Sequence, residues 1–300
     1  MKLIRLLSLL ILSLSQPIWV TAQDMSLHEI LAEEKGWVVV AQGYQFTDAL
    51  CADSEGNLYF TDVAKGGAIY KVDLEGKLSS LVADAPKISG LKFGTDGKFY
   101  AATQVPEKQI VTISLDGKLT VLATGVAPND LVVSRKGFVY FTETSNGRIQ
   151  MISPTGKLSV ADVGPYKPNG ITLSPDQGTL VCSDFDGTHL FVFRVEADGS
   201  LSSRAPYMTV VTPLNKIQSL GDGMTTDASG RYYVATAVGI QVFDPIGRLC
   251  GVISKPESKF ISNVTFAGKN HGFLYVSCSD KIYRREMKAR GMQSVKPIAP

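Results

Sequence analysis

A run of seven residues, GFVYFTE at Gly137–Glu143, is one of six similar runs along the chain. Each run begins with a glycine and continues with β-branched or aromatic residues, which is typical of a short strand. The six glycines are Gly56, Gly97, Gly137, Gly178, Gly230 and Gly272, with spacings of 41, 40, 41, 52 and 42 residues. The chain therefore consists of six repeats, most of them about 40 residues long.

A second pattern follows the first five runs and indicates β-hairpins. In IVTISLDGKLTVLA at Ile110–Ala123, alternating apolar residues enter an Asp-Gly turn and leave as another strand. Each repeat thus holds four short strands, and such a unit cannot bury both faces alone. Radial stacking of six units buries them, which predicts an all-β, six-bladed β-propeller with four antiparallel strands per blade.

The two ends of the chain predict how the ring closes. The sixth repeat ends at KIYRREMKARG, Lys281–Gly291, without an outermost strand. The segment Trp37–Ala41 is a suitable strand and precedes the first repeat. We therefore expect this N-terminal strand to complete the last blade; the alternative is an open array of repeats.

The first 22 residues have the pattern of a signal peptide. Lys2 and Arg5 precede the apolar run Leu6–Leu14, and Val20-Thr21-Ala22 forms a small-residue cleavage site. We predict a signal peptide at 1–22, a lead-in at 23–36, the propeller at 37–290 and a C-terminal tail at 291–300. The mature protein is expected to be secreted or periplasmic and free of the membrane; an uncleaved anchor is the alternative.

Composition excludes several classes of function. Without the first 22 residues, the chain has 28 basic and 28 acidic residues. This balance argues against a nucleic-acid partner. The four cysteines lie far apart with no C-x-x-C spacing, so we assign them no chemistry. The three histidines form no recognisable pair, and the sequence gives no indication of oligomeric state.

One column of polar residues points to a metal site. It lies eight or nine positions before the repeat glycines and consists of Asp48, Ser89, Asn129, Asn169, Asp222 and Asn263. The innermost strand of each blade lines the central channel, so these residues would form a ring around the axis. Oxygen donors without nitrogen or sulfur favour a hard divalent cation, Ca²⁺ first, with Mg²⁺, Mn²⁺ or Zn²⁺ as alternatives. Each residue alone could instead be an ordinary turn residue.

Three motifs resemble the family of senescence marker protein, gluconolactonase and luciferin-regenerating enzyme. They are PNDLVVSRKGFVYFTE at Pro128–Glu143, KPNGITLSPDQGTLVCSD at Lys167–Asp184 and GDGMTTDASGRYYVAT at Gly221–Thr236. The resemblance runs from about Val38 to Arg285. It implies a six-bladed propeller with one divalent cation in the channel.

The resemblance also implies roles for individual residues. The family's cation ligands correspond to Asp48, Asn169 and Asp222, with Asn129 beside the metal and in contact with substrate. Two positions depart from the family pattern. The family's E-G-P is Asp48-Ala49-Leu50 here, and an arginine found in some sugar lactonases is Ala127.

These residues together predict an exported, Ca²⁺-dependent hydrolase that opens a lactone or related ester. The cation would be held by Asp48, Asn169, Asp222 and Asn129. Asp222 is the candidate general base. Asn129, Ser89 and Asn263 are candidate substrate-binding residues. Two alternatives are a non-catalytic binding module with a structural metal and a phosphotriesterase-like hydrolase, because one fold hosts many functions.

Overall fold

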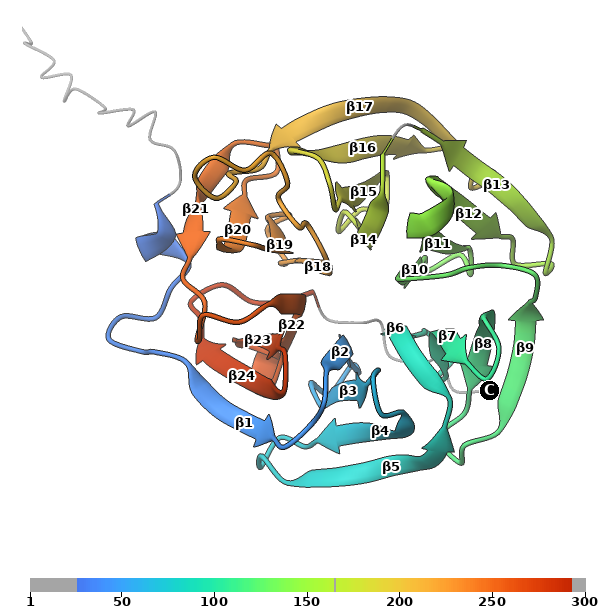
Figure 1. The fold of residues 1–300 in the computed structure, drawn as a ribbon, viewed down its shortest axis with the longest axis horizontal. Coiled ribbons are helices and arrows are strands. Elements are labelled where there is room, and N and C mark those ends of the chain that lie inside the picture. The colour runs from blue at the N-terminus through green and yellow to red at the C-terminus, as the bar shows by residue number, and fades with distance from the viewer. Residues whose placement is uncertain (1–25, 165, 293–300) are drawn as a thin grey trace, which may run out of the picture.

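The computed structural model of the chain describes residues 26–164 and 166–292, and these form a closed ring of blades (Figure 1). Within these residues, 24 strands make six sheets of four strands each. Every sheet is antiparallel, and neighbours in sequence pair within a blade. The predicted six-bladed β-propeller is confirmed.

The blades are numbered here in chain order, each from the channel outwards. Blade 1 is β2 (Thr47–Ala52), β3 (Leu58–Asp62), β4 (Gly67–Val72) and β5 (Leu78–Ala85). Blade 2 is β6 (Lys87–Phe93), β7 (Phe99–Val105), β8 (Gln109–Ile113) and β9 (Leu119–Ala123). Blade 3 is β10 (Leu131–Val133), β11 (Val139–Glu143), β12 (Arg148–Ile152) and β13 (Leu158–Val163). Blade 4 is β14 (Pro168–Leu173), β15 (Thr179–Asp184), β16 (His189–Val195) and β17 (Leu201–Thr209). Blade 5 is β18 (Met224–Thr226), β19 (Tyr232–Thr236), β20 (Gly239–Phe243) and β21 (Leu249–Ile253). Blade 6 is β22 (Ile261–Ala267), β23 (Phe273–Cys278), β24 (Lys281–Glu286) and β1 (Val38–Gln42).

The N-terminal strand closes the ring as the sequence predicts. Strand β1 pairs antiparallel with β24, with Val38 opposite Arg284 and Gln42 opposite Lys281. Figure 1 shows β1, from the start of the chain, lying at the outer edge of the last blade. The closure ties the two ends of the propeller together and leaves no first or last blade with an uncovered face.

The hydrophobic core is divided among the blade interfaces. Six buried clusters are found in the described residues, one between each pair of adjacent blades. Between blades 1 and 2, for example, Tyr59 and Ile69 pack against Ile88, Phe99 and Val111. Because each blade is covered on both faces, second strands such as β3, β11 and β19 are buried along their whole length.

Short segments outside the blades pack against the ring. Three 3₁₀ turns are described: η1 (Leu27–Glu29), η2 (Thr144–Asn146) and η3 (Lys269–His271). Ile30, just after η1, is fully buried against blades 5 and 6. None of the helical segments among the described residues is long and apolar enough to cross a membrane. The predicted signal peptide lies outside the described residues.

The four cysteines are all unpaired. Cys51, Cys182 and Cys278 are buried and Cys250 is half-buried. Burial raises the pKa of the Cys51 thiol to about 12. A thiol that stays protonated is a weak nucleophile and a poor metal ligand, so Cys51 behaves as an apolar core residue.

Candidate functional site

The predicted polar column lies at one end of the first strands, where the strand pairing is irregular. Asp48 and Asn263 lie in β2 and β22 at positions where the register with the second strand shifts, and Asn169 lies within such a shift in β14. Ser89 occupies a similar shift in β6. Asn129 and Asp222 each lie two residues before a first strand, β10 and β18 respectively. A bulge interrupts the alternation of side chains and redirects them, which suits a ring of polar groups on a strand that is otherwise buried.

A ring of hydrogen bonds joins neighbouring blades at the level of this column. Each of the six bonds has its acceptor carbonyl on the segment at or just before the first strand of the next blade. They are Thr61 Oγ1 to Ile88 O (2.7 Å), Ser89 Oγ to Asn129 O (2.6 Å), Thr142 Oγ1 to Asn169 O (2.7 Å), Ser183 Oγ to Asp222 O (3.1 Å), Gly223 N to Ser262 O (2.9 Å) and Ser262 Oγ to Thr47 O (2.9 Å). Three of the acceptors belong to column residues. The backbone of the site is therefore fixed by the packing of the blades.

Two glycines allow the first strands to approach each other closely. A Cβ atom on Gly170 would lie 2.0 Å from the carbonyl oxygen of Asp222, and one on Gly223 would lie 2.4 Å from Cγ of Asn263. Distances below 3 Å are not tolerated without movement of the neighbour. These glycines follow Asn169 and Asp222 directly, so the close packing brings the polar column residues together.

Asp48 is held in place by two donors on a single oxygen. Its Oδ1 accepts from the backbone N–H of Ala49 (2.8 Å) and from Nδ2 of Asn263 (3.1 Å). Asp48 is half-buried, but protein atoms surround its carboxyl group on most sides. The resulting loss of hydration raises the pKa of Asp48 to about 7. The two hydrogen bonds oppose the shift, and the nearby carboxylate of Asp130 adds to it.

Asp222 lies in the same environment. Burial raises its pKa well above the usual value, and the carboxylates of Asp48 and Asp130 raise it further. Burial also raises the pKa of Asp130, against the influence of Lys92. Three carboxyl groups on or near the axis thus interact with one another, and each would be more readily ionised beside a cation.

An amide oxygen completes a donor set for such a cation. Oδ1 of Asn169 is buried and has no hydrogen-bond partner among the described residues, and the whole residue is 5% exposed. A buried acceptor without a partner is costly unless a ligand satisfies it. No three His, Cys, Asp or Glu side chains of the described chain converge on a metal position by themselves. A cation here would therefore use carboxylate and amide oxygens together, which suits a hard ion such as Ca²⁺.

Two further residues were not predicted as part of the site. Asp130 is 2% exposed. Its Oδ1 accepts a hydrogen bond from the backbone N–H of Leu131 (2.8 Å), and its Oδ2 has no partner among the described residues. Gln104, on β7, donates from Nε2 to Ser89 Oγ (2.8 Å) and to the carbonyl of Pro128 (2.6 Å). Ser89 is thus bound to Gln104 and to the Asn129 backbone. The only sequence signal for Asp130 was its place beside Asn129.

The opposite end of the channel has a different character. A cavity of about 180 Å³ lies there, lined by Lys92, Thr172, Thr226, Thr265 and His271 among others. These residues come from the later parts of the first strands and from η3, so the cavity lies beyond the column along the axis. None of the predicted site residues lines this cavity.

Fold and site together define a class: six-bladed propellers with an oxygen-lined polar site on the central axis. The chain belongs to the SMP-30/gluconolactonase/LRE-like family, whose family model matches residues 46–280. This span contains all six column residues.

Individual relatives agree with this assignment. The chain is 28% identical over 240 residues to a gluconolactonase of Zymomonas mobilis, covering 69% of this chain and 65% of that protein. It is 23% identical over 234 residues to the pentonolactonase XacC of Haloferax volcanii, covering 74% of this chain and 77% of the relative. The chain thus spans about two thirds of the gluconolactonase's length. Among solved structures, regucalcin of Agrobacterium tumefaciens, described as a calcium-binding protein, has a TM-score of 0.74 at 16% identity, covering 88% of this chain and 98% of that chain.

Proposed function

We propose that this protein is a divalent-cation-dependent hydrolase that opens lactones, with its active site in the central channel. The observation that carries the proposal is the pair of enclosed carboxylates, Asp48 and Asp222, beside the unpartnered amide oxygen of Asn169. The lactonase names of the two relatives support the reaction type.

The residues that we assign to hold the cation are Asp48, Asn169, Asp222 and, as the sequence predicts, Asn129. When bound, a divalent cation would supply Lewis-acid chemistry, polarising the ester carbonyl and stabilising the negative charge that develops on its oxygen. Ca²⁺ is our first choice because all candidate donors are oxygens and two are carboxylates. The calcium-binding regucalcin with the same fold supports this choice.

The chain's own residues would then position the reactants and move the proton. Asp222 would accept a proton from the water that attacks the carbonyl carbon. The bond between that carbon and the ring oxygen would then break, and the ring oxygen would leave as an alcohol after taking the proton that Asp222 accepted from the water. Asn129, fixed through its backbone carbonyl by Ser89, would orient the ester. Asn263 would hold Asp48 in position through its hydrogen bond.

The experiment compares wild type with Asp222→Asn and with a control, Asp198→Asn. Asp198 lies fully exposed in the turn between β16 and β17, where it accepts from Ser200. We expect Asp222→Asn to lose at least a hundredfold in kcat/KM for lactones and to bind less Ca²⁺, with Asp198→Asn unchanged. Full activity and metal content in Asp222→Asn would refute the proposal. Ca²⁺ binding without turnover of any lactone would favour the binding-module alternative, and turnover of phosphotriesters only would favour that chemistry.

Export is a separate part of the proposal and rests on residues 1–22. We propose that the chain is cleaved after Ala22 and acts outside the cytoplasm. N-terminal sequencing of the protein recovered from the periplasm or medium tests this, with Gln23 expected as the first residue.

A further inference from the structure

Three phenylalanines lie at the end of the channel that holds the polar column. Phe46 is two residues before Asp48, and Phe260 is three residues before Asn263. Phe185 follows β15, and its N–H bonds to the carbonyl of Lys167, two residues before Asn169. All three are half-buried.

Their rings come together although they belong to different blades. The ring centroids of Phe46 and Phe260 are 6.2 Å apart, with the planes at 24°. Those of Phe185 and Phe260 are 6.5 Å apart, with the planes at 54°. Phe185 belongs to blade 4 and Phe260 to blade 6, so their contact spans blade 5, whose first strand follows Asp222. The rings therefore form an apolar patch at the end of the channel that holds the polar column, and we call it the phenylalanine arc.

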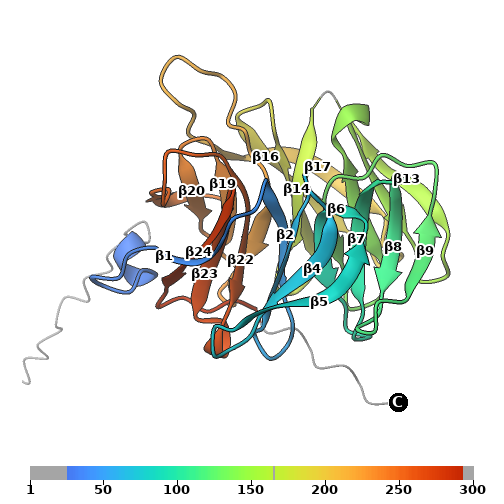
Figure 2. The same cartoon turned by 60° about the horizontal axis from the view of Figure 1, so that its bottom comes forward.

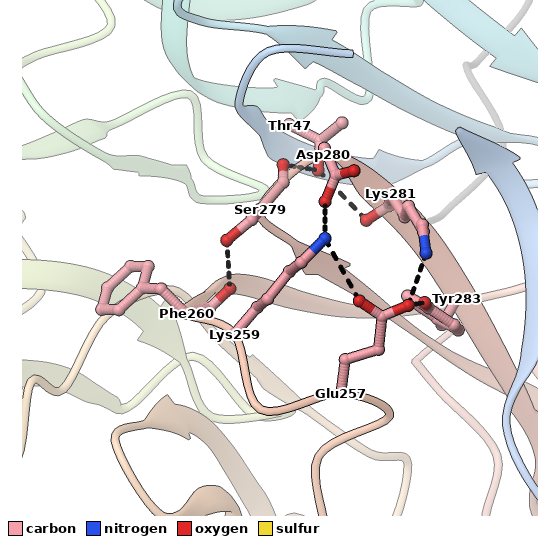
Figure 3. Close-up of polar contacts among 8 residues, drawn as sticks. All are labelled: Thr47, Glu257, Lys259, Phe260, Ser279, Asp280, Lys281 and Tyr283. Carbon is pink, nitrogen blue, oxygen red and sulfur yellow. Dashed lines mark hydrogen bonds and ion pairs between the residues drawn. The ribbon is translucent and has the colours of Figure 1, made fainter. Parts of the chain in front are cut away.

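Ion pairs fix the segment that carries Phe260. Lys259 Nζ contacts Asp280 at 2.6 Å and Glu257 at 3.3 Å, and Glu257 also pairs with Lys281 at 2.5 Å. Glu257 further accepts from the hydroxyl of Tyr283. Figure 3 shows these contacts on one side of the segment and the Phe260 ring turned away from them.

The backbones of the other two phenylalanines are held as well. The N–H of Phe46 donates to the buried carboxylate of Asp62 (3.1 Å), and its carbonyl accepts from Val63 N (2.9 Å). The carbonyl of Phe185 accepts from Leu220 N (3.0 Å). A surface fixed before binding loses little conformational entropy when a ligand covers it.

At this end of the channel, three of the residues that lie two positions before the column residues offer little to a polyhydroxylated substrate. Leu220, half-buried, occupies the position two residues before Asp222, and Ala127 the position two residues before Asn129. Lys167, at the equivalent position of blade 4, forms an ion pair with Asp186. Asp186 in turn accepts from Gln218 (3.0 Å). A sugar lactone would leave hydroxyl groups against phenylalanine rings without hydrogen-bond partners.

We propose that the phenylalanine arc selects lactones with an apolar substituent, alkyl or aryl, over polyhydroxylated sugar lactones. This inference rests on the proposed function, because it places the ester at the polar column and the substituent on the rings. Phe46, Phe185 and Phe260 are then specificity residues. Burying an apolar substituent against the rings removes apolar surface from water, which favours binding. This contribution to the binding free energy grows with the apolar area that the rings cover.

The test uses three six-membered lactones with the same ester: δ-valerolactone without a substituent, δ-decanolactone with a pentyl group, and D-glucono-1,5-lactone with hydroxyl groups. The metal-loaded full chain is expected to show kcat/KM about 30-fold higher for δ-decanolactone than for δ-valerolactone, and lowest for the sugar lactone. Phe260→Ala and Phe46→Ala should each lower the ratio of decanolactone to valerolactone about tenfold. Phe260→Leu keeps an apolar side chain and should lower it less than threefold.

Phe138→Ala is the matched control. Phe138 is also half-buried but lies in the turn between β10 and β11, at the opposite end of the first strands, so its loss should leave the ratio unchanged. A preference for D-glucono-1,5-lactone, or a ratio that Phe260→Ala and Phe46→Ala do not change, would overturn the inference.

A binding measurement separates this inference from the proposed function. If no lactone is hydrolysed, the proposed function fails, and calorimetric titration then decides the role of the arc. Tighter binding of δ-decanolactone than of δ-valerolactone, lost in Phe260→Ala, supports the arc as a binding surface. Equal binding of the two lactones, or no binding, refutes it.

Discussion

Replacing Asp48 by asparagine should stabilise the metal-free protein, and the effect should depend on pH. Asparagine has nearly the same shape and can keep both hydrogen bonds that Oδ1 accepts from Ala49 and Asn263. What it removes is the charge. Burial raises the pKa of Asp48 from 3.8 to about 7, so the folded metal-free protein binds a proton that the unfolded chain releases.

The sign and size of the effect follow from this difference. The raised pKa contributes stability that is fully present below about pH 4 and is lost as the pH rises through about 7. Each unit by which the pKa rises corresponds to about 1.4 kcal/mol, so the rise from 3.8 to about 7 disfavours the ionised carboxylate by about 4 kcal/mol in the folded state. Part of the side chain remains open to water, so we expect about half of this amount to appear in measurements.

The assay is urea unfolding with a chelator present, at pH 5 and at pH 8. At pH 8, Asp48→Asn should have a free energy of unfolding about 2 kcal/mol higher than wild type, and at pH 5 the difference should shrink below about 1 kcal/mol. With saturating Ca²⁺ the order should reverse, because wild type retains the ligand and the variant does not. A variant that is less stable than wild type at pH 8 without metal would refute the idea that the axis concentrates uncompensated negative charge.

Three other perturbations test the geometry of the site. Ca²⁺ at about 100 times its dissociation constant should raise the melting temperature of wild type by roughly 5 to 10 °C, and that of Asp222→Asn by much less, as differential scanning fluorimetry would show. Gly223→Ala places a Cβ atom 2.4 Å from Cγ of Asn263, so it should displace the Asn263 side chain. Urea titration should show a free energy of unfolding lower by about 1–3 kcal/mol, and calorimetry should show weaker Ca²⁺ binding. Ala49 has φ of +57°, the left-handed region that favours glycine, so Ala49→Gly should raise the urea midpoint modestly, by the equivalent of about 0.5 kcal/mol. An unchanged or lower midpoint would mean that Ala49 is not strained.

The architecture could be predicted from sequence because its signal repeats. Six glycines at nearly equal spacing, each followed by a β-rich run, indicate six equal units, and equal units stack in a ring. The missing fourth strand of the last unit indicated where Trp37–Ala41 belongs, and β1 occupies that place. The polar column could be predicted for the same reason, because equivalent positions in equivalent repeats share a height along the axis.

Other features of the site depend on single repeats, so the pattern could not show them. Asp130 is the only acidic residue at its position; the equivalents in four other blades are alanine or glycine, such as Ala49 and Gly170. The phenylalanines do not form a repeating column: Phe46 and Phe260 each directly precede a first strand, whereas Phe185 follows a second strand. They meet only because the ring closes.

The long spacing of 52 residues between Gly178 and Gly230 shows a similar limit. It indicates that one repeat is longer than the others but not where the extra residues lie. The structure places many of them between β17 and β18, in a segment that projects from the edge of the ring (Figure 2). Because fourth-to-first connections lie at the end of the channel that holds the column, this insertion borders the site. Leu214 and Ile217 within it are 90% and 80% exposed.

The chemistry of this site follows from differences between the blades. Identical repeats would place six equal groups around the axis, and a symmetric ring cannot distinguish the two sides of an ester. Here the carboxylates of the column belong to blades 1 and 5, on either side of Asn263 in blade 6, and the phenylalanine arc covers the same side. On the other side, Ser89 and Asn129 of blades 2 and 3 are uncharged, with the buried carboxyl group of Asp130 beside them. An ester would therefore meet the two column carboxylates on one side and amide and hydroxyl groups on the other, at the end of the channel where the rings favour an apolar substituent. A divalent cation would offset the charge of the two column carboxylates and leave no excess positive charge to attract an anion, so the site suits a neutral substrate such as a lactone.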